Sequence, residues 1–402
     1  MFSSAFLRRS VAASLYFALS FCTFAFSQTF TVLHTFQCST DGGAPFSGLV
    51  RGKDGNLYGT ASIQGSTPAA DGTVYKVTPS GQFKVIHTFT GGNDGLAPGA
   101  SVIQDAAGNL YGTTSNGGPS NAGVVWKITP AGHESVIYTF TAGSDGGYPF
   151  SDLIRDSKGN LYGTTFGGGD SACSSYLNGC GTVFKIDNTG HETVLHSFEG
   201  GLDGEYPYAG LVMDSARNLY GATAYDDGAD FEGGGQVFEI DGSGNKTVVY
   251  DFTPGTSGGD TPTTDLTFAP GHVLYGTAAE GGDMNACSGF GCGVVYRIDS
   301  NNVATTIHTF EGQPSSGGAP TGPLARDAAG NLYGVTFRGG ANDLGVVFKL
   351  DPSGNETLLH SFTGSSDGSA PHGRLYLDSQ GNIYGTASAS GSGCGTIFKI
   401  TP

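Results

Sequence analysis

Two groups of residues in this sequence have the types and spacing to bind or transform a ligand. The first comprises Asp152, Asp265 and Arg374, which share one position before a recurring leucine, with His372 close to Arg374. Paired carboxylates can hydrolyse glycosidic bonds. For both groups a binding site is predicted more strongly than a catalytic one, and an ordinary solvated surface is the alternative. The second group is an acidic and aromatic loop that could hold a sugar ring, and it contains Tyr225, Asp226, Asp227, Asp230, Phe231 and Glu232.

The residues of the first group depart from a repeated pattern. In other copies of the pattern the same position is held by a small residue, Gly48 or Gly210. A small residue fits where several chain segments crowd together, whereas a charge in such a place needs a partner, a water molecule or a ligand. The exchange of Gly for Asp or Arg therefore indicates function better than the repeat does.

A sevenfold repeat positions both groups. Its most complete form is GNLYGTT at residues 108–114, and its tyrosine recurs every 51 to 58 residues. A fixed period of about this length is typical of propellers and solenoids. We interpret the tyrosines as packing residues of a repeated strand rather than as reactive groups. They are Tyr58, Tyr111, Tyr162, Tyr220, Tyr275, Tyr333 and Tyr384.

Three further segments recur in each period beside the tyrosine strand. One is short and apolar and follows a proline, one is GTVFKI-like, and one is ETVLHSF-like. All are rich in β-branched or aromatic residues and are bounded by Gly, Pro, Asp or Asn, which indicates strands. Tight turns join the first strand to the tyrosine strand and the third strand to the fourth. We therefore expect four-stranded antiparallel blades and almost no helix.

The order of the strands at the two ends predicts a closed ring. The sequence after residue 27 begins with an outer strand at 30–36, and residues 395–400 form a third strand that no outer strand follows. Residues 28–40 should therefore supply the outer strand of the last blade. The predicted fold is an all-β, seven-bladed β-propeller spanning residues 28–402, in which closure leaves only short strand edges.

The connections between strands differ in length. The tight turns should lie on one face of the ring, and the long, variable loops should lie on the other. Function is carried disproportionately by loops on a rigid scaffold, so we expect the site on the variable-loop face.

Six cysteines lie beyond residue 27. An even number in an exported chain indicates disulfides, and the ligand spacing of a zinc site is absent. Two predicted pairs each brace one long loop. The third pair flanks two strands that are neighbours only in a closed ring, so it would lock the ring and contribute about 4–5 kcal/mol. The predicted pairs are Cys38–Cys394, Cys173–Cys180 and Cys287–Cys292.

Five histidines recur in the outer strands and five aspartates recur in D-G-x-x-P turns. The histidines belong to separate blades, and tyrosine replaces them in two others, so we expect structural hydrogen bonds rather than a shared metal ion. Each aspartate should cap its own turn, although a ring of carboxylates that binds Ca²⁺ at the channel mouth is the alternative. We therefore expect no cofactor. The residues are His34, His87, His196, His308 and His360, and Asp41, Asp94, Asp145, Asp203 and Asp367.

Residues 1–27 differ in composition from the repeats. Arg8 and Arg9 precede an uncharged apolar run, and Ala25 and Ser27 are small residues at the positions that signal peptidase requires. The run is short for a membrane span, which takes about 20 apolar residues. We predict a cleaved signal peptide, a mature chain without a membrane span, and a secreted or periplasmic location.

The charge of the chain excludes one class of partner. The formal net charge is −17, and it becomes −19 when Arg8 and Arg9 leave with the signal peptide. An acidic surface repels phosphate backbones, so nucleic acid is not an expected partner. Motifs of serine hydrolases, zinc proteases and nucleotide-binding folds do not occur at a usable place.

The combination of D-x-x-GNLYGTT, GTVFKI-x-P-x-G and ETVLHSF resembles a tandem repeat of exported bacterial proteins, the Gloeobacter–Verrucomicrobia (GloVer) repeat. The resemblance covers residues 30–402 and is weakest in the fifth unit, where residues 268–273 replace the usual turn. It implies export and repeated β-rich units. It assigns no catalytic residues.

These observations predict a secreted, monomeric binding or scaffold module that recognises an extracellular polysaccharide or protein on its variable-loop face. The alternative is a carbohydrate-active enzyme, either a polysaccharide lyase or a glycoside hydrolase, with its site at the channel mouth. A third hypothesis is a purely structural envelope protein. A hydrolase needs two facing carboxylates and a lyase needs a cation beside Tyr or His, whereas a binding site needs only aromatic and hydrogen-bonding groups.

Overall fold

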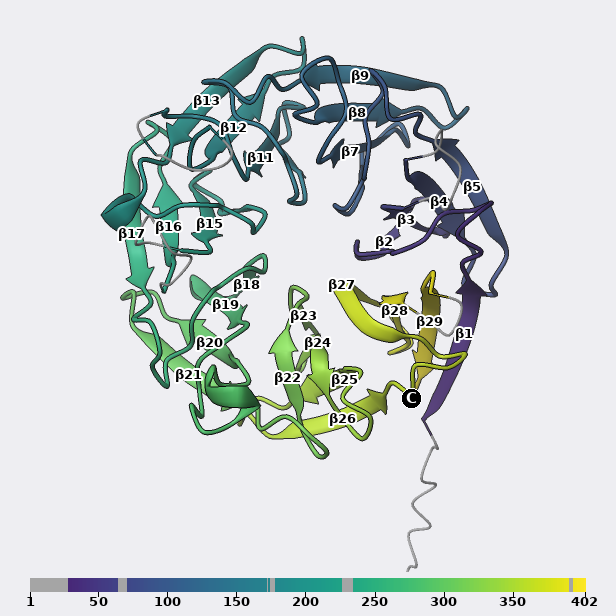
Figure 1. Cartoon of the computed structure of the whole chain (residues 1–402), viewed down its shortest axis with the longest axis vertical. Coiled ribbons are helices and arrows are strands. Elements are labelled where there is room, and N and C mark those ends of the chain that lie inside the picture. The colour runs from purple at the N-terminus through teal and green to yellow at the C-terminus, as the bar shows by residue number, and fades with distance from the viewer. Residues whose placement is uncertain (1–27, 64–70, 172, 174–177, 226–233, 390–392) are drawn as a thin grey trace, which may run out of the picture.

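The described part of the chain forms a closed ring of seven antiparallel blades, and we call the centre of this ring the channel (Figure 1). A computed structural model describes residues 28–63, 71–171, 173, 178–225, 234–389 and 393–402. The only helical segments within these ranges are two short 3₁₀ turns, η1 (Gly201–Asp203) and η2 (Cys287–Gly289). The predicted all-β, seven-bladed propeller is confirmed.

The strands follow one order in every blade, from the channel outward. The inner strands are β2 (Val50–Arg51), β6 (Ile103–Gln104), β10 (Ile154–Arg155), β14 (Val212–Met213), β18 (Thr267–Ala269), β23 (Ala325–Arg326) and β27 (Ser369–Leu377). The second strands are β3 (Leu57–Ala61), β7 (Leu110–Thr114), β11 (Leu161–Thr165), β15 (Leu219–Thr223), β19 (Val273–Ala278), β24 (Leu332–Gly339) and β28 (Ile383–Ala389). The third strands are β4 (Thr73–Val77), β8 (Val124–Ile128), β12 (Thr182–Ile186), β16 (Gln236–Ile240), β20 (Val294–Ile298), β25 (Val346–Leu350) and β29 (Thr396–Thr401). The outer strands are β5 (Phe83–Thr88), β9 (Glu134–Thr139), β13 (Glu192–Ser197), β17 (Lys246–Asp251), β21 (Ala304–Thr309), β26 (Glu356–Ser361) and β1 (Thr29–Thr35).

The two ends of the chain close the ring, as predicted. Strand β1 pairs antiparallel with β29, from Thr29 opposite Thr401 to Thr35 opposite Thr396. The blades are numbered 1 to 7 in the chain order of their inner strands, from β2 to β27. Blade 7 therefore consists of β27, β28, β29 and β1, and Figure 1 shows the first strand of the chain lying outside the last. The predicted disulfide between Cys38 and Cys394 is present, with the two Cα atoms 5.3 Å apart. It joins segments 356 residues apart in sequence.

The turn that precedes each tyrosine strand explains most of the repeated motif. In blade 2, Oδ1 of Asp105 accepts hydrogen bonds from the backbone N–H groups of Ala107 and Asn109. Its Oδ2 accepts from the Asn109 amide at 2.8 Å and from the Tyr111 hydroxyl at 3.0 Å. Gly108 takes a φ of 88°, which favours glycine. One carboxylate thus connects Asp, Gly, Asn and Tyr, so these residues recur together.

The hydrophobic core lies between blades rather than within one sheet. Clusters such as that of Tyr58, Val74 and Phe89 from blade 1 with Leu110 and Trp126 from blade 2 join each blade to its neighbour. Each third strand carries an aromatic residue that is almost fully buried. A glycine on the second strand makes room for it, because a Cβ added at that glycine in blade 2 would lie 2.4 Å from the Trp126 ring.

Blades 5 and 6 vary the pattern without breaking the ring. In blade 5, residues 268–273 replace the usual turn, yet β18 and β19 still pair with Thr267 opposite Tyr275. In blade 6, an additional strand β22 (Gly317–Pro320) pairs with the far end of β24, while β23 pairs with its start. The single strand β27 of blade 7 spans the same two places. Pro323 lies between β22 and β23, and the equivalent stretch of β27, between His372 and Tyr376, also lacks ladder pairs.

The predicted signal peptide, residues 1–27, lies outside the described residues and stays a prediction. In the part of the chain that the structure covers, no helix has the length and hydropathy to cross a bilayer.

Candidate functional site at the channel mouth

The four residues of the first predicted group line a single cavity. Asp152, Asp265, His372 and Arg374 come from blades 3, 5 and 7, and all border a cavity of about 420 Å³ at the variable-loop end of the channel. This volume lies within the range of small-molecule sites, about 300–1,000 Å³. The structure therefore brings together the residues that the register of the repeat grouped, and their role in binding stays a prediction.

Each charged side chain has a backbone partner on the preceding blade. Oδ1 of Asp152 accepts a hydrogen bond from the Ser101 N–H, and Oδ1 of Asp265 accepts one from the Gly210 N–H, both at 2.6 Å. The Ser101 hydroxyl oxygen likewise accepts a hydrogen bond from the Gly48 N–H, at 3.0 Å. These side chains satisfy inner-edge amides that the ladders leave unpaired, so part of their role is structural.

Asp265 and Arg374 form the only ion pair that the structure describes inside this cavity. Nη2 of Arg374 lies 3.6 Å from Oδ2 of Asp265, and its Nη1 donates a long hydrogen bond of 3.5 Å to the Leu324 carbonyl. Burial, and next the charge of Asp152, raise the pKa of Asp265 to about 6, although Arg374 and the Gly210 N–H oppose the rise. The floor of the cavity is therefore acidic, and Asp265 ionises at a cost.

His372 lies at the rim and is neutral near pH 7. Burial lowers its pKa to about 4. Its ring packs edge-on against Phe46 at 5.0 Å between centroids, and it lies 5.8 Å from the ring of Phe337. A neutral imidazole in this place can donate or accept a hydrogen bond and adds no charge.

Sequence reasoning missed the aromatic rim of the cavity. Phe46, Phe150 and Tyr208 follow the proline that precedes each inner strand, and His372 holds the same position in blade 7. Phe46 is 40% exposed and Tyr208 is 44% exposed. The rings of Phe150 and Tyr208 lie nearly parallel with centroids 5.6 Å apart. The signal that could have revealed them is a variable post-proline position that holds a ring in four blades.

The second predicted group lies mostly outside the described residues. Asp226, Asp227, Asp230, Phe231 and Glu232 belong to that undescribed part, so their role as a binding loop stays a prediction. Tyr225 is described, and its ring lies 6.2 Å from that of Tyr206. Tyr206 in turn packs on Phe166, which meets both Phe150 and Tyr208. An aromatic path therefore connects the base of this loop to the cavity rim.

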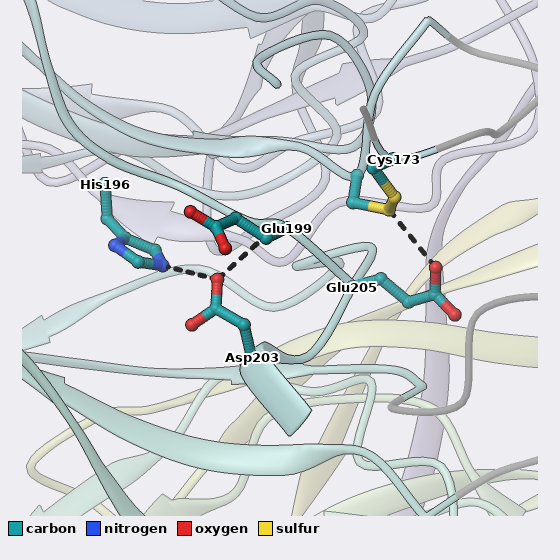
Figure 2. The surroundings of a disulfide bond; sticks show 6 residues. Cys173, His196, Glu199, Asp203 and Glu205 are labelled. Carbon is teal, nitrogen blue, oxygen red and sulfur yellow. Dashed lines mark hydrogen bonds and ion pairs between the residues drawn. A yellow bond between two sulfur atoms is a disulfide. The ribbon is translucent and has the colours of Figure 1, made fainter. Parts of the chain in front are cut away.

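At the outer seams, where the outer strand of one blade meets that of the next, four of the five repeated histidines lie beside a repeated aspartate, and His308 lies beside Glu356. In blade 3, Nε2 of His196 and the Glu199 N–H both lie 3.0 Å from Oδ2 of Asp203 (Figure 2). The same pairing joins His34 to Asp41 and His360 to Asp367. In blade 2 the Tyr138 hydroxyl takes the place of the histidine and donates to Asp145. These residues cap turns and join strands, and none of them borders the cavity.

Both predicted loop disulfides are present. The Cα atoms are 5.8 Å apart for Cys173–Cys180 and 5.2 Å apart for Cys287–Cys292. The group Cys173, Cys180 and Glu205 is the only set of three or more potential metal ligands brought together among the described residues. Figure 2 shows its two sulfur atoms joined to each other beside the Glu205 carboxylate. The disulfide leaves no thiolate, the form of cysteine that binds zinc.

Known structures share the fold at low sequence identity. Puromycin hydrolase is 15% identical with a TM-score of 0.56, covering 88% of this chain and 51% of the enzyme, so this chain spans about half the enzyme's length. A luciferin-regenerating enzyme is 11% identical with a TM-score of 0.46, covering 94% of this chain and 96% of its own. At these identities the likeness concerns the fold alone. No curated protein matches the sequence.

The repeat itself places the chain in a family. The profile of the Gloeobacter/Verrucomicrobia repeat matches residues 21–177 and 285–402, which together form more than half of the chain. The unmatched middle contains the unusual turn of blade 5. The chain belongs to the Gloeobacter/Verrucomicrobia repeat family.

Proposed function

We propose that this protein is an exported propeller that binds a carbohydrate in the cavity at the channel mouth. The observation that carries the proposal is the combination of an exposed aromatic rim with an acidic, hydrogen-bonding floor in one cavity. Export rests on the predicted signal peptide and agrees with three disulfides, which persist in oxidising compartments.

The chemistry of the rim suits a sugar ring. One face of a pyranose is largely C–H and packs flat on an aromatic ring, while its hydroxyl groups point outward. Phe150 and Tyr208 offer rings at the entrance, and Asp152 and Asp265 offer acceptors below. Arg374 adds donors for ring or hydroxyl oxygens. A small-ligand site usually consists of an apolar cavity that contains a few polar groups.

A glycan fits this site better than a folded protein partner does. A stable protein interface buries about 800 Å² on each side and is nearly flat. The exposed rings of Phe46 and Tyr208 instead surround a concave cavity of about 420 Å³. An end or a short segment of a polysaccharide can enter such a cavity.

A glycan screen with a matched pair of variants tests the proposal. Phe150→Ala removes a ring from the rim, and Phe290→Ala removes a ring that is 64% exposed and outside the cavity. We expect Phe150→Ala to weaken binding of the best glycan about tenfold, since a stacked ring is lost, and Phe290→Ala to leave it unchanged. The absence of any glycan ligand, or an equal effect of both variants, would contradict the proposal.

A second candidate is a carbohydrate-active enzyme at the same site. Burial, and next the charge of Asp152, raise the pKa of Asp265 to about 6. This favours an enzyme, because the general acid of a glycosidase has a raised pKa. Arg374 and the neutral His372 also supply the groups that a lyase needs. Against it, one oxygen of each carboxylate already accepts a short backbone hydrogen bond. An assay for new reducing ends and unsaturated products on each bound glycan separates enzyme from binding protein.

A further inference from the structure

The negative charge of the cavity floor is concentrated on one side of the ring. Asp152 and Asp265 belong to blades 3 and 5, and Gly210 of blade 4 stands between them. A Cβ at Gly210 would lie 2.9 Å from Oδ1 of Asp265 and 3.1 Å from the Asp152 carbonyl oxygen. Glycine at this position therefore lets both acidic residues approach the same point of the inner edge.

The cavity has less positive than negative charge. Among the described residues that line it, Arg374 is the only one with a permanent positive charge, whereas Asp152 and Asp265 both contribute carboxylates. The guanidinium is 36% exposed and lies 3.6 Å from one carboxylate oxygen of Asp265. Burial is the main cause of the raised pKa of Asp265, and the nearby charge of Asp152 adds to it while Arg374 opposes it.

Two aromatic side chains of blades 3 and 4, Phe150 and Tyr208, line the cavity together with Asp152 and Asp265. Phe150 is two residues before Asp152, and Tyr208 is two residues before Gly210, whose N–H binds Asp265. Their nearly parallel faces border the same cavity. A cation over an aromatic face gains electrostatic energy from the ring, and desolvation in a cavity strengthens it.

We propose that the glycan bound here carries a positively charged amine, as an unacetylated amino sugar does, an inference that rests on the proposed function. The ammonium group binds between the carboxylates of Asp152 and Asp265, and the sugar ring that bears it packs on Phe150 and Tyr208. The mature chain, with a net charge of −19 once Arg8 and Arg9 are removed, attracts such a ligand and repels uronic acids and sulfated sugars.

Three β-1,4-linked tetrasaccharides that differ only at the second carbon test the proposal. They are the tetramers of glucosamine, N-acetylglucosamine and glucose, which present an ammonium, an acetamide and a hydroxyl group at one place. Calorimetric titration of the full chain should show the glucosamine tetramer binding at least about tenfold more tightly than the other two, because only it forms charge-assisted hydrogen bonds.

Two variants, each of which removes one negative charge, distinguish binding at the cavity from a general attraction of the amine to an acidic protein. Asp152→Asn keeps an acceptor for the Ser101 N–H and should abolish most of the preference for the amine. Glu199→Gln removes a charge from an exposed side chain outside the cavity and should preserve the preference. A preference that survives in Asp152→Asn would overturn the inference.

The remaining outcomes distinguish this inference from the function on which it rests. Equal binding of all three tetramers overturns the amine preference and leaves carbohydrate binding in place. Binding of tetramethylammonium without binding of any tetramer overturns carbohydrate recognition and retains selectivity for a cation. Binding of none of these probes, with a neutral or acidic glycan found in the wider screen, also overturns the amine preference.

Discussion

Asp203 at an outer seam is partly buried and Asp265 at the channel mouth is buried, but the surroundings of the two carboxylates shift their pKa values in opposite directions. Burial disfavours ionised Asp203, yet hydrogen bonds from His196, the Glu199 N–H and Lys246 together lower its pKa to about 2. Burial and Asp152 instead raise the pKa of Asp265 to about 6. Ionised Asp203 at the seam therefore stabilises the fold, whereas ionised Asp265 at the mouth destabilises it.

The difference follows the repeat. The aspartate of the seam recurs in five blades with a backbone partner four residues earlier, as Gln37, Thr90, Thr141 and Thr363 show beside Glu199. The charges of the mouth occur at a position that holds an uncharged residue in the other four blades, namely Gly48, Ser101, Gly210 or Pro323. The residues that recur form contacts that the fold needs in every blade, and we propose that the charges that depart from the repeat bind a ligand. A binding site that costs stability is common in proteins, because function selects groups that folding alone does not favour.

The largest effect is expected from Asp203→Ala at the seam. The change removes the carboxylate that pairs with Lys246, whose side chain is only 7% exposed and whose Nζ lies 3.0 Å from Oδ1 of Asp203, although Lys246 keeps its hydrogen bonds to the Asp203 carbonyl and to Gln236. Removing one member of a buried pair costs about 3–5 kcal/mol, and the 25% exposure of Asp203 reduces the expected loss to about 2–3 kcal/mol. Urea unfolding measures the loss, and glycan titration should show unchanged affinity. A large loss of affinity in a folded variant would break the proposed division between seam and mouth.

The opposite result is expected from Asp265→Asn at the mouth. Asparagine keeps an acceptor for the Gly210 N–H and removes the charge that burial penalises. Because the folded-state pKa lies above 3.8, stability falls as pH rises from about 4 to about 6, and the variant should lack this fall. At pH 8 we expect a gain of about 1–2 kcal/mol, since each pKa unit is worth about 1.4 kcal/mol and Asp152 shares part of the shift. Glycan affinity should decrease about tenfold.

Most of the ring architecture could be predicted from the sequence, because the strands and turns that form it are specified by local, repeated residues. The tyrosine period, the turn residues and the out-of-phase ends predicted seven blades, ring closure and the Cys38–Cys394 bridge, all of which the structure contains. The site could be predicted only in part. Register alone grouped Asp152 with Asp265 and Arg374, because one position of a repeat occupies one radius of the ring.

The aromatic rim and the local role of each charge could not be predicted in this way. Phe150 and Tyr208 stack across two blades, and such a contact depends on the angle between blades rather than on a period. The backbone partners of Asp152 and Asp265 lie 51 and 55 residues earlier in the chain. Nothing in the local sequence shows that the neighbouring blade leaves those amides unpaired.

The smallest effect is expected from Glu192→Gln, which separates electrostatic cost from function. Glu192 lies at the seam of blades 2 and 3, and burial and then Asp145 raise its pKa from 4.5 to about 7. The folded chain holds this proton more tightly than the unfolded chain, so stability falls as pH rises from about 4.5 to about 7. Solvent screening of a partly exposed group limits the expected gain of the variant at pH 8 to about 0.5–1 kcal/mol, with no gain at pH 4. Unfolding at both pH values measures it. If glycan affinity is unchanged, a raised pKa alone does not mark the site, and the cavity with its aromatic rim is what distinguishes Asp265 from Glu192.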